Sequence, residues 1–448
     1  MITIYEDPAD AAAILTRRTM ATVADVPDVV LASIERVFGQ PLTPEEAVSR
    51  LLADVRLSGD AALREWTERI DGVAVEALEV PSSTWETAFH GLSPELKAAL
   101  KRASSRIQDF HARQPIPNWT TEEMGGILGQ RFVPLERVGV YVPGGTAPLP
   151  SSLLMAVIPA RVAGVDEVIV CTPTDRKTGE PSPLILAAAQ IAGVDRVFAL
   201  GGALAVAALA FGTESVPKVD KVVGAGGLFT TLAKRQVYGI VGLDGLYGPT
   251  ETVIVADDTA NPTWVAADLL AQAEHDVLAT AILLTPSREL AAAVQAEVVR
   301  QAERLSRSGV IETSLVGQGG IVLTPDLATA VRLADEFAPE HLCLSVANPR
   351  AWAERIRNAG GIFLGEHSFE VLGDYVAGPS HIMPTGGTAR FKGPVNVLDF
   401  VKVINLIGLD SETAGRLAAD ADRIATAESL TAHAAAARWR IATDEDMT

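Results

Sequence analysis

The run QAEHD, from Gln272 to Asp276, closes a stretch that is rich in Ala and Leu and begins after Pro262. A helix is expected there. Residues three apart on a helix share one face, so Gln272 and His275 would lie side by side. Taken alone, the run also fits an ordinary polar last turn, in which a protonated His is mildly favoured near the helix C-terminus. The other histidines of the chain bear on the choice.

A second pair that could do chemistry is Glu340-His341, within the segment APEHL. The pair ends an expected helix and leads into the apolar run LCLSV, which is expected to form a strand. Element ends of this kind feed the loops in which α/β sheets carry their sites. A carboxylate beside an imidazole is a plausible acid and base. An exposed helix end is the alternative for the pair considered by itself.

Two further segments carry carboxylates and imidazoles. FEVLGDYVAGPSHIMPTGG contains Glu370, Asp374 and His381, among glycines that let a backbone approach a ligand closely. AESLTAH, near the C-terminus, contains Glu428 and His433. A turn with solvated carboxylates and a solvated helix face are the respective alternatives.

Together these segments offer imidazole, carboxylate and amide groups. Two imidazoles and a carboxylate suit Zn²⁺, but Gln is an unusual ligand, so the spacing leaves the metal open. No G-x-G-x-x-G occurs, because the glycine-rich runs GAGGLF and GQGGIV both depart from it. A Walker A loop is absent from the sequence as well.

The elements around these groups must position them. From near Arg137, β-rich runs alternate with Ala/Leu-rich helices. This alternation predicts βαβ units and parallel sheets. Val162–Val170 and Ile191–Ala199 repeat one join of helix, glycine and strand, in which Gly164 and Gly193 are expected to end the helices.

The flanking segments are expected to be helical. The chain up to about residue 115 has a helical period with a cap at Thr43. A boundary between two α/β series is expected near Gly248-Pro249. The Ala-rich segment after Lys392 is expected to form a separate helical C-terminal part.

Composition narrows the class of protein. A chain of 448 residues is long enough for two or more domains. Its net charge of −19 argues against a nucleic-acid surface. No apolar run of about 18 residues lacks charge, so no membrane span is expected. The N-terminus lacks the pattern of a signal peptide. With only Cys171 and Cys343, a disulfide framework is excluded and a reducing cytoplasm fits.

Six segments occur in the order found in one family: VGVYVPGGTAPLPSSLLM, GPTETVIVAD, DLLAQAEHD, APEHL, GDYVAGPSHIMPTGGTARF and AESLTAH. On these segments, from residue 30 to about 440, the chain resembles the L-histidinol dehydrogenases. The resemblance implies an α/β fold of two incomplete Rossmann-like parallel-sheet domains with small helical N- and C-terminal segments.

The same resemblance implies boundaries for these parts. Residues 1–30 would form the N-terminal helical segment. Residues 31–139 and 251–392 would form the first α/β domain, with the zinc and substrate residues. Residues 140–250 would form the second α/β domain, on the nucleotide side. Residues 393–448 would form a C-terminal helical segment that reaches the partner subunit.

The family oxidises histidinol to histidinal and then to histidine with NAD⁺. By resemblance, His341 would be the general base for the alcohol, and Glu340 would activate water on the aldehyde. One Zn²⁺ per subunit would be held by Gln272, His275, Asp374 and His433. His433 would come from the partner in a homodimer with shared active sites. The positions implied to contact the small amino alcohol are Thr250, which stands where the family usually has Ser, Gln272, His275, His341, Glu370, Asp374, His381, Glu428 and His433.

The implied cofactor region departs from the family. Tyr141, a position that would contact NAD⁺, is kept. Leu204 replaces a Gln and Gly227 replaces an Asn at positions expected to hold the nucleotide, and Phe369 replaces a Pro in the substrate loop.

Two other interpretations stay open. A paralogue could oxidise another small polar alcohol, such as a sulfonated diol. A zinc-binding homologue with weak catalysis could have a structural or regulatory role, which the Leu204 and Gly227 changes suggest. The pair Glu370 and Glu428 favours an amine-bearing substrate over a sulfonate, because a sulfonate would need Arg or Lys.

Overall fold

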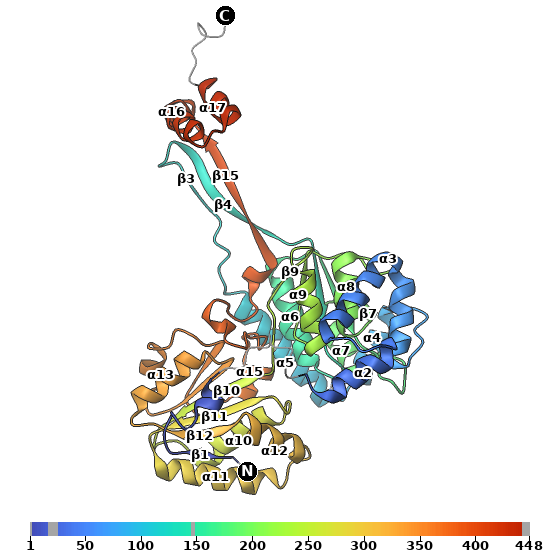
Figure 1. The fold of residues 1–448 in the computed structure, drawn as a ribbon, viewed down its shortest axis with the longest axis vertical. Helices are drawn as coiled ribbons and strands as arrows, with labels where there is room; N and C mark the ends of the chain where they lie inside the picture. Colours follow the sequence, from blue (N-terminus) through green and yellow to red (C-terminus); the bar gives the residue numbers. More distant parts are fainter. Residues whose placement is uncertain (1, 17–25, 145–147, 441–448) are drawn as a thin grey trace, which may run out of the picture. The chain divides into compact units, whose positions relative to one another are not determined.

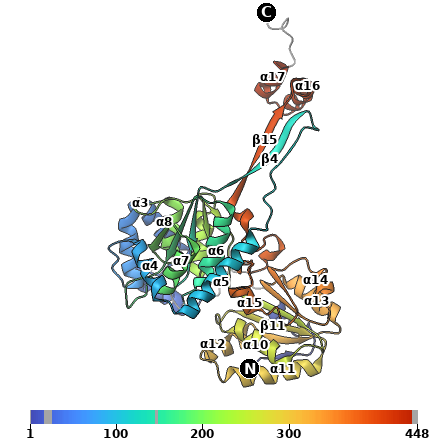
Figure 2. The ribbon, with the colours of Figure 1, turned by 180° about the vertical axis from the view of Figure 1, so that it is seen from behind.

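The structure is a computed structural model and describes residues 2–16, 26–144 and 148–440. The chain divides into two units, the first made of residues 1–114 and 135–400 and the second of residues 115–134 and 401–448. Figure 1 and Figure 2 show the same ribbon from opposite sides. The first unit holds two six-stranded sheets, and the second holds one three-stranded sheet. The expected α/β fold with parallel-sheet domains is confirmed.

The first sheet has the strand order β2-β7-β6-β5-β8-β9. Its neighbouring strands are parallel, except that β2 runs antiparallel to β7. Strands β6 and β7 follow β5 in the sequence and lie on one side of it, whereas β8 lies on the other side of β5. This reversal of direction is the switch point of a doubly wound sheet. The strands are β2 (Glu79–Val80), β5 (Arg137–Tyr141), β6 (Glu167–Thr172), β7 (Arg196–Ala199), β8 (Lys221–Val223) and β9 (Gly242–Leu243).

Two groups of helices accompany this sheet: α3, α8 and α9 pack on one another, and α4 to α7 form the other group (Figure 2). Gly164 and Gly193 end α6 and α7 in the left-handed region, with φ of 90° and 70°, as the sequence predicts. Thr43 caps α3 and forms a reciprocal capping box with Glu46. The helices are α2 (Asp28–Phe38), α3 (Pro44–Asp71), α4 (Ser82–Gly91), α5 (Pro94–His111), α6 (Pro150–Ala163), α7 (Pro183–Ala192), α8 (Gly202–Phe211) and α9 (Leu228–Val237).

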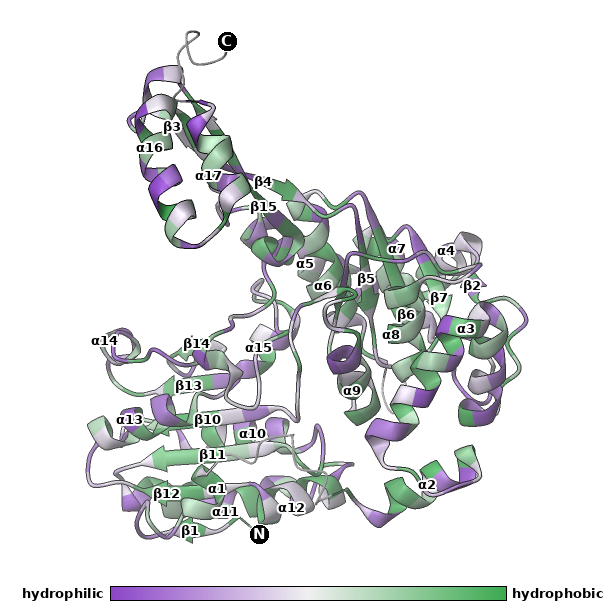
Figure 3. Ribbon diagram, turned by 45° about the horizontal axis from the view of Figure 1, so that its top comes forward, coloured by the Kyte–Doolittle hydropathy of each residue, from purple (hydrophilic) through white to green (hydrophobic). Residues whose placement is uncertain are grey.

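The second sheet has the order β1-β12-β11-β10-β13-β14, and all its neighbouring strands are parallel. Every residue of β10 and β13 is buried, and Figure 3 colours the strands of both large sheets mostly as hydrophobic. Such apolar strands are typical of a sheet that is covered on both faces. The strands are β1 (Ile4–Tyr5), β10 (Glu251–Ala256), β11 (Thr280–Thr285), β12 (Gly320–Leu323), β13 (His341–Ser345) and β14 (Gly361–Leu364).

The second sheet also alternates with helices, so that α10 returns the chain from β10 to β11 and α13 leads from β12 to β13. The helices are α1 (Ala12–Leu15), α10 (Pro262–Ala273), α11 (Arg288–Ala302), α12 (Ser308–Gly317), α13 (Leu327–Phe337), α14 (Pro349–Ala353) and α15 (Glu370–Tyr375), followed by the short turns η2 (Thr388–Arg390) and η3 (Val397–Phe400).

The N-terminal residues do not pack with the sheets to which the expected boundaries assigned them. Residues 31–139 were expected beside 251–392, yet Val48 and Trp66 of α3 share an apolar core with Val206 of α8, beside the first sheet. Conversely, the extreme N-terminus joins the second sheet, because Ile4 pairs with Ile321 in β12. The apolar stripe of α3 buries itself against α8, and periodicity alone does not reveal which sheet such a stripe will meet.

The second unit contains an antiparallel sheet of order β15-β4-β3 and two helices. The elements are β3 (Trp119–Thr121), β4 (Gly126–Pro134), β15 (Val401–Leu409), α16 (Ser411–Ala427) and α17 (Thr431–Arg438). The C-terminal part was expected to be entirely helical, and β15 corrects this. Its sequence VKVINLIGL is rich in β-branched residues, and all nine pair with β4. None of the helices within the described residues is long and apolar enough to cross a membrane.

Candidate active site

The candidate residues of the first unit gather at the amino-terminal edge of the second sheet. Thr250 precedes β10, Glu340 precedes β13, and His341 is the first residue of β13. These strands are parallel neighbours, with Thr252 opposite His341, so their amino ends are adjacent. Helix α10 returns the chain to this edge and brings Gln272 with it. Ligands of α/β sheets usually bind beyond the carboxyl ends, so this site occupies the opposite edge.

Glu340 is buried and accepts two hydrogen bonds through Oε2. The Thr250 hydroxyl donates at 2.6 Å, and the backbone N–H of Glu251 donates at 3.1 Å. Burial raises the pKa of Glu340 well above its usual range, while the bond from Thr250 acts in the opposite direction. A carboxyl group whose pKa is moved towards neutrality can exchange a proton, as a general base must.

His341 is 4% exposed, and only one of its ring nitrogens is engaged. Nδ1 lies 3.3 Å from the carbonyl oxygen of Glu251, which can only accept, so Nδ1 carries the proton. Nε2 is therefore the basic nitrogen, and it has no hydrogen-bond partner among the described residues. Burial lowers the pKa of His341, while the carboxylate of Asp374 raises it. The neutral ring presents Nε2 as a proton acceptor.

Helix α15 brings two carboxyl groups to the same place. Glu370 accepts a hydrogen bond from the Thr252 hydroxyl, and its Oε1 lies 3.9 Å from Nδ1 of His341. Burial raises the pKa of Glu370 to about 7 and that of Asp374 to about 6. Asp374 Oδ1 lies 3.8 Å from Nε2 of His341. Carboxyl groups packed this closely around an imidazole favour a cation at the site.

His381 flanks Asp374. Its Nδ1–H donates to the backbone carbonyl of Asp374 at 2.7 Å, and the Ser152 hydroxyl lies 3.2 Å from its Nε2. Burial lowers the pKa of His381 to about 4. A ring held at both nitrogens has a fixed orientation.

The helix expected to run through Asp276 ends earlier, because Gln272 lies in the last turn of α10 and His275 follows the C-cap Glu274, so the two do not share a helix face. They also differ in their exposure. Gln272 is completely buried, whereas His275 is exposed. The pKa of His275 is lowered, first by desolvation and then by the nearby His341. Because the side chain of His275 is exposed to solvent, His275 lies at the open side of the site.

The amide of Gln272 has the properties of a metal ligand. Its Oε1 lies 3.4 Å from the Thr250 hydroxyl, and its Nε2 has no partner among the described residues. The single proton of that hydroxyl goes to Glu340, so Thr250 can only accept from Gln272. Turning the amide by 180° makes Nε2–H that donor and leaves Oε1 buried and free. A free amide oxygen at this edge suits a cation.

The first unit alone does not complete a metal site. Over residues 2–16, 26–144 and 148–440, no three His, Cys, Asp or Glu side chains converge as a cation would require. The set expected from the sequence includes only His275 and Asp374 of these types in the first unit. Its other members are an amide and a residue of the second unit.

Glu428 and His433 lie in the second unit, on either side of the turn that joins α16 to α17. Both are exposed. Between them, Ser429 adopts φ of 63°, a left-handed conformation that is unusual for a residue other than Gly. The turn presents both side chains to solvent.

Two of the three expected cofactor residues, Tyr141 and Gly227, lie at the switch point of the first sheet. Tyr141 ends β5, and its hydroxyl accepts from the backbone N–H of Gly202 at 3.2 Å. Gly227 is the exposed N-cap of α9, and a Cβ there would have no atom within 4 Å. Leu204 is 3% exposed and packs in the apolar core. Two of the three residues therefore lie where a doubly wound sheet binds a nucleotide, and Leu204 contributes packing instead.

Three further residues, which the sequence alone did not reveal, lie around the site. Asp268 lies four residues before Gln272, a helical spacing that could have revealed it, and burial followed by the charge of Glu370 raises its pKa to about 7. Arg106 of α5 donates to the carbonyls of Val376 and Ala377 at 2.7 and 3.0 Å, just after α15. Ser152, beside His381, is the third. Arg106 and Ser152 are each more than 200 residues from their partners, so no local pattern reveals them.

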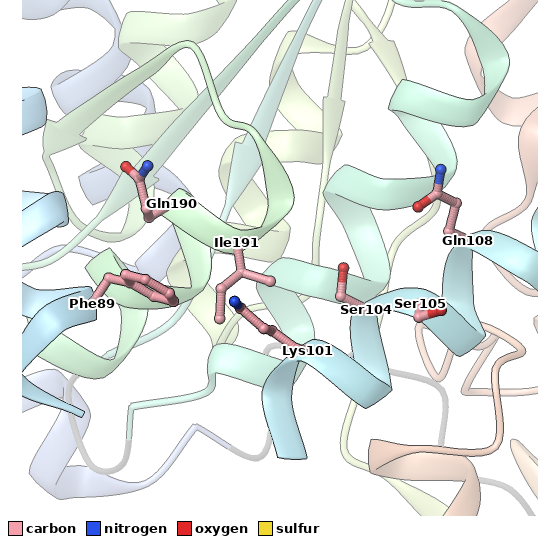
Figure 4. A pocket seen from close by; sticks show the side chains of 7 residues that line it. All are labelled: Phe89, Lys101, Ser104, Ser105, Gln108, Gln190 and Ile191. Carbon is pink, nitrogen blue, oxygen red and sulfur yellow. The ribbon is translucent and has the colours of Figure 1, made fainter. Parts of the chain in front are cut away.

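A surface cavity of about 340 Å³ lies among α4, α5 and α7 and shares no residue with this site (Figure 4). It is lined by Phe89, Lys101, Ser104, Ser105, Gln108, Gln190 and Ile191.

The fold and the site define a two-lobed α/β protein. One lobe contains the first, doubly wound sheet, and the other contains the second sheet with a buried cluster of carboxyl and imidazole groups. The sequence model of the histidinol dehydrogenases matches residues 39–441, and the chain belongs to the histidinol dehydrogenase family.

Individual relatives agree with this assignment. The chain is 51% identical to a histidinol dehydrogenase of Deinococcus radiodurans over 97% of this chain and 98% of the relative. It is 52% identical to one of Thermus thermophilus over 88% of this chain and 93% of the relative. The crystal structure of histidinol dehydrogenase from Elizabethkingia anophelis superposes with a TM-score of 0.89 at 31% identity, covering 98% of each chain.

Proposed function

We propose that this chain oxidises L-histidinol to L-histidine through histidinal, reducing two NAD⁺. The observation that carries the proposal is the buried pair Glu340 and His341, with the Nε2 of His341 unpartnered among the described residues. A dehydrogenase of an alcohol needs such a base, because the hydroxyl proton must leave before or with the hydride. The similarity to relatives named histidinol dehydrogenase supplies the substrate.

His341 acts as the base in the first oxidation. Its Nδ1–H is fixed by the carbonyl of Glu251, so Nε2 keeps a free lone pair that can take the hydroxyl proton. When Nε2 takes the hydroxyl proton, the imidazolium is stabilised by Glu370 and Asp374, whose oxygens lie 3.9 and 3.8 Å from the ring nitrogens. The carboxyl groups thereby lower the cost of forming the charged ring.

Glu340 acts in the second oxidation, which adds water to the aldehyde. Its Oε2 is occupied by the Thr250 hydroxyl and the N–H of Glu251, so the other oxygen is available to a water molecule. Burial keeps the pKa of this carboxyl high, which makes its anion a stronger base than an exposed Glu. The two oxidations therefore use different residues: His341 is the base for the alcohol, and Glu340 activates water on the aldehyde.

Gln272, His275, Asp374 and a partner's residue equivalent to His433 would hold Zn²⁺. When bound, the ion would polarise and orient the amino and hydroxyl groups of the substrate. The free amide oxygen of Gln272 and the open side at His275 support this ligand set.

The substrate is proposed to be a small cationic amino alcohol. Glu370 is 1% exposed, so a positive group beside it would relieve the cost of its burial. Glu428 would add a second carboxylate from the partner, while Thr250, His381 and the metal ligands would fix the rest of the molecule. A sulfonated substrate would find carboxylates where it needs cations.

NAD⁺ is proposed to bind at the switch point of the first sheet, near Tyr141 and Gly227. There the N-terminus of α9 offers N–H groups to a phosphate. Leu204 lies next to this region, and its burial supports the helix rather than the ligand.

A homodimer with shared sites is proposed because the second unit exposes many large apolar side chains for its size. Ile407 is 78% exposed, Trp439 63%, Ile424 61% and Val403 50%. Exposed apolar residues gathered in so small a unit are typical of protein interfaces. Cys171 and Cys343 are both free, which suits the reducing cytoplasm proposed as the location.

A steady-state assay with histidinol and NAD⁺ tests this function. We expect two NADH for each histidinol consumed, with histidine as the product. NADH formation from a sulfonated diol but not from histidinol would favour a paralogue. Zinc binding without oxidation of either alcohol would favour a structural or regulatory homologue.

A further inference from the structure

A buried network of charged and phenolic groups lies beside the switch point of the first sheet, and none of the roles proposed above uses it. Lys234 of α9 is 1% exposed, Asp244 just after β9 is 1% exposed, and Tyr247 is 5% exposed. Lys234 Nζ donates to Asp244 Oδ1 at 2.6 Å, and the Tyr247 hydroxyl donates to Asp244 Oδ2 at 3.0 Å. Burial raises the pKa of Tyr247 well above 10, so the phenol keeps its proton.

The network hydrogen-bonds both backbone polar groups of one residue, Gly224, in the glycine-rich loop. The N–H of Gly224 donates to Asp244 Oδ2 at 2.7 Å, and the carbonyl of Gly224 accepts from Lys234 Nζ at 2.8 Å. Gly224 has φ of 113°, and a Cβ there would lie 2.2 Å from the carbonyl oxygen of Tyr141. The loop is therefore pressed against the end of β5 and cannot shift without breaking buried bonds.

The same network reaches the second sheet through the connection from β9 to β10. The Thr231 hydroxyl lies 2.9 Å from the carbonyl of Tyr247 and 3.4 Å from that of Gly226. The N–H of Gly248 donates to the Thr385 hydroxyl at 2.6 Å. Two residues later, Thr250 contacts Glu340. The chain from Tyr247 through Gly248 to Thr250 thus links the network to the acid/base residues.

We infer that Lys234 and Asp244 are positioning residues that hold the loop Gly224–Gly227 in a fixed relation to Thr250, and so set where the nucleotide lies against the substrate. The inference rests on the proposed function. A buried ion pair is weak evidence of stabilisation, because desolvation offsets much of the attraction between the charges. The structure assigns this pair a geometric task, since both charges also bind the backbone of Gly224.

The main test is the double variant Lys234→Met with Asp244→Asn, which leaves no unpaired buried charge. Asn can still accept from the N–H of Gly224, but the carbonyl of Gly224 loses its donor. We expect the Kd for NAD⁺ by calorimetry and the KM for NAD⁺ to rise about 10-fold or more, as when a charge-assisted hydrogen bond is lost. The KM for histidinol and the zinc content should stay near those of the parent.

A milder variant keeps the inference testable if the double variant does not fold. Tyr247→Phe removes one donor to Asp244 while keeping the ring, and it should weaken NAD⁺ binding by about 2- to 10-fold.

A control comes from Asp60, another buried carboxylate of the same lobe, which accepts from the Thr213 hydroxyl at 2.6 Å and from the Ser215 N–H at 3.2 Å. Asp60→Asn should lower the Tm without changing the Kd for NAD⁺. If the Lys234 and Tyr247 variants lower the Tm in the same way and leave NAD⁺ affinity unchanged, the pair only stabilises the fold and the inference is wrong.

The proposed function can fail separately. A parent chain that binds NAD⁺ but does not oxidise histidinol would refute the proposed substrate and leave this inference standing. A parent chain that binds no NAD⁺ would refute the inference as well, because Gly224–Gly227 would then not be a nucleotide loop.

Discussion

At the scale of single residues, the site depends on how each polar group divides its hydrogen bonds. The Thr250 hydroxyl has one proton, and its 2.6 Å contact with Glu340 takes that proton. Gln272 must then donate to Thr250, which leaves its amide oxygen free. In this way a hydroxyl that serves the proposed base also orients a proposed metal ligand. Ser at position 250 could do the same, because only the hydroxyl is used.

The first residue-scale prediction concerns the metal. Changing His275 to Asn should sharply lower bound zinc, because it removes one of only four expected protein ligands. Elemental analysis of the purified variant measures this. His90→Asn is the matched control, since His90 lies on α4, outside the site, and should retain zinc. Full stoichiometric zinc in the His275 variant would remove His275 from the ligand set.

The second residue-scale prediction separates the two oxidations. His341→Asn should slow oxidation of the alcohol by roughly 10²–10⁴-fold, the usual value of a positioned proton transfer. Glu340→Gln should slow oxidation of the aldehyde far more than that of the alcohol, because it removes the group that activates water. Rates with histidinol and histidinal, supplied separately, measure both effects. Equal losses on the two substrates for Glu340→Gln would contradict its assigned role.

At the scale of elements, the effect of each substitution in the cofactor region depends on the position of the residue in its helix. Gly227 is the N-cap of α9, with φ of −68° and open space around a Cβ. Asn fits this conformation without strain and is a better N-cap than Gly. Leu204 instead lies inside the apolar core, where an unpaired amide would be costly. The two positions should therefore respond differently to the amides found elsewhere in the family.

We predict that Gly227→Asn tightens NAD⁺ binding by about 2- to 10-fold, the value of one net hydrogen bond. It should also raise the free energy of unfolding by a few tenths of a kcal/mol through the cap. Leu204→Gln should lower that free energy and bring little gain in affinity. Calorimetry and urea unfolding of both single variants measure these effects. Tighter NAD⁺ binding by Leu204→Gln alone would show that its side chain reaches the nucleotide.

The elements that local sequence determines were predictable, and those that depend on distant partners were not. Thr43 and the glycines at 164 and 193 mark helix ends through short-range hydrogen bonds and φ preferences, so their roles could be read directly. Helix α3 carries a clear apolar stripe, but the stripe matches either sheet, and its true partner lies more than 100 residues away. The Ala-rich surroundings of β15 similarly hid its strand, because its pairing residues in β4 are more than 250 positions earlier.

The candidate site also combines residues that local sequence revealed with contacts between distant residues that it did not. The adjacent pair at 340 and 341 was visible as a pair, but the shared helix face expected for Gln272 and His275 is wrong, because α10 ends at Ala273 and His275 follows its C-cap Glu274. The sequence could not show that both groups meet at the amino edge of the second sheet. That follows from β10 and β13 being parallel neighbours, although about 90 residues separate them.

At the scale of the whole molecule, the proposed site needs residues from both units. Glu428 and His433 stand exposed on a strained turn of the second unit, whereas the remaining proposed ligands belong to the first. If a second chain supplies the turn, each site of a symmetric dimer contains residues of both subunits. Activity should then depend on assembly. Sedimentation that showed a fully active monomer would exclude a shared site.

Mixing inactive variants gives the sharpest test of this sharing. In a heterodimer of His275→Asn and His433→Asn chains, one site collects both substitutions and the other collects neither. Random exchange of subunits should therefore restore about a quarter of the parent activity, because half of the dimers are mixed and each has one intact site. Gln272→Ala mixed with His275→Asn is the matched control. Both substitutions lie in the first unit, so every site keeps one defect and no activity should return. Restoration in the control mixture, or none in the first, would mean that each chain builds its site alone.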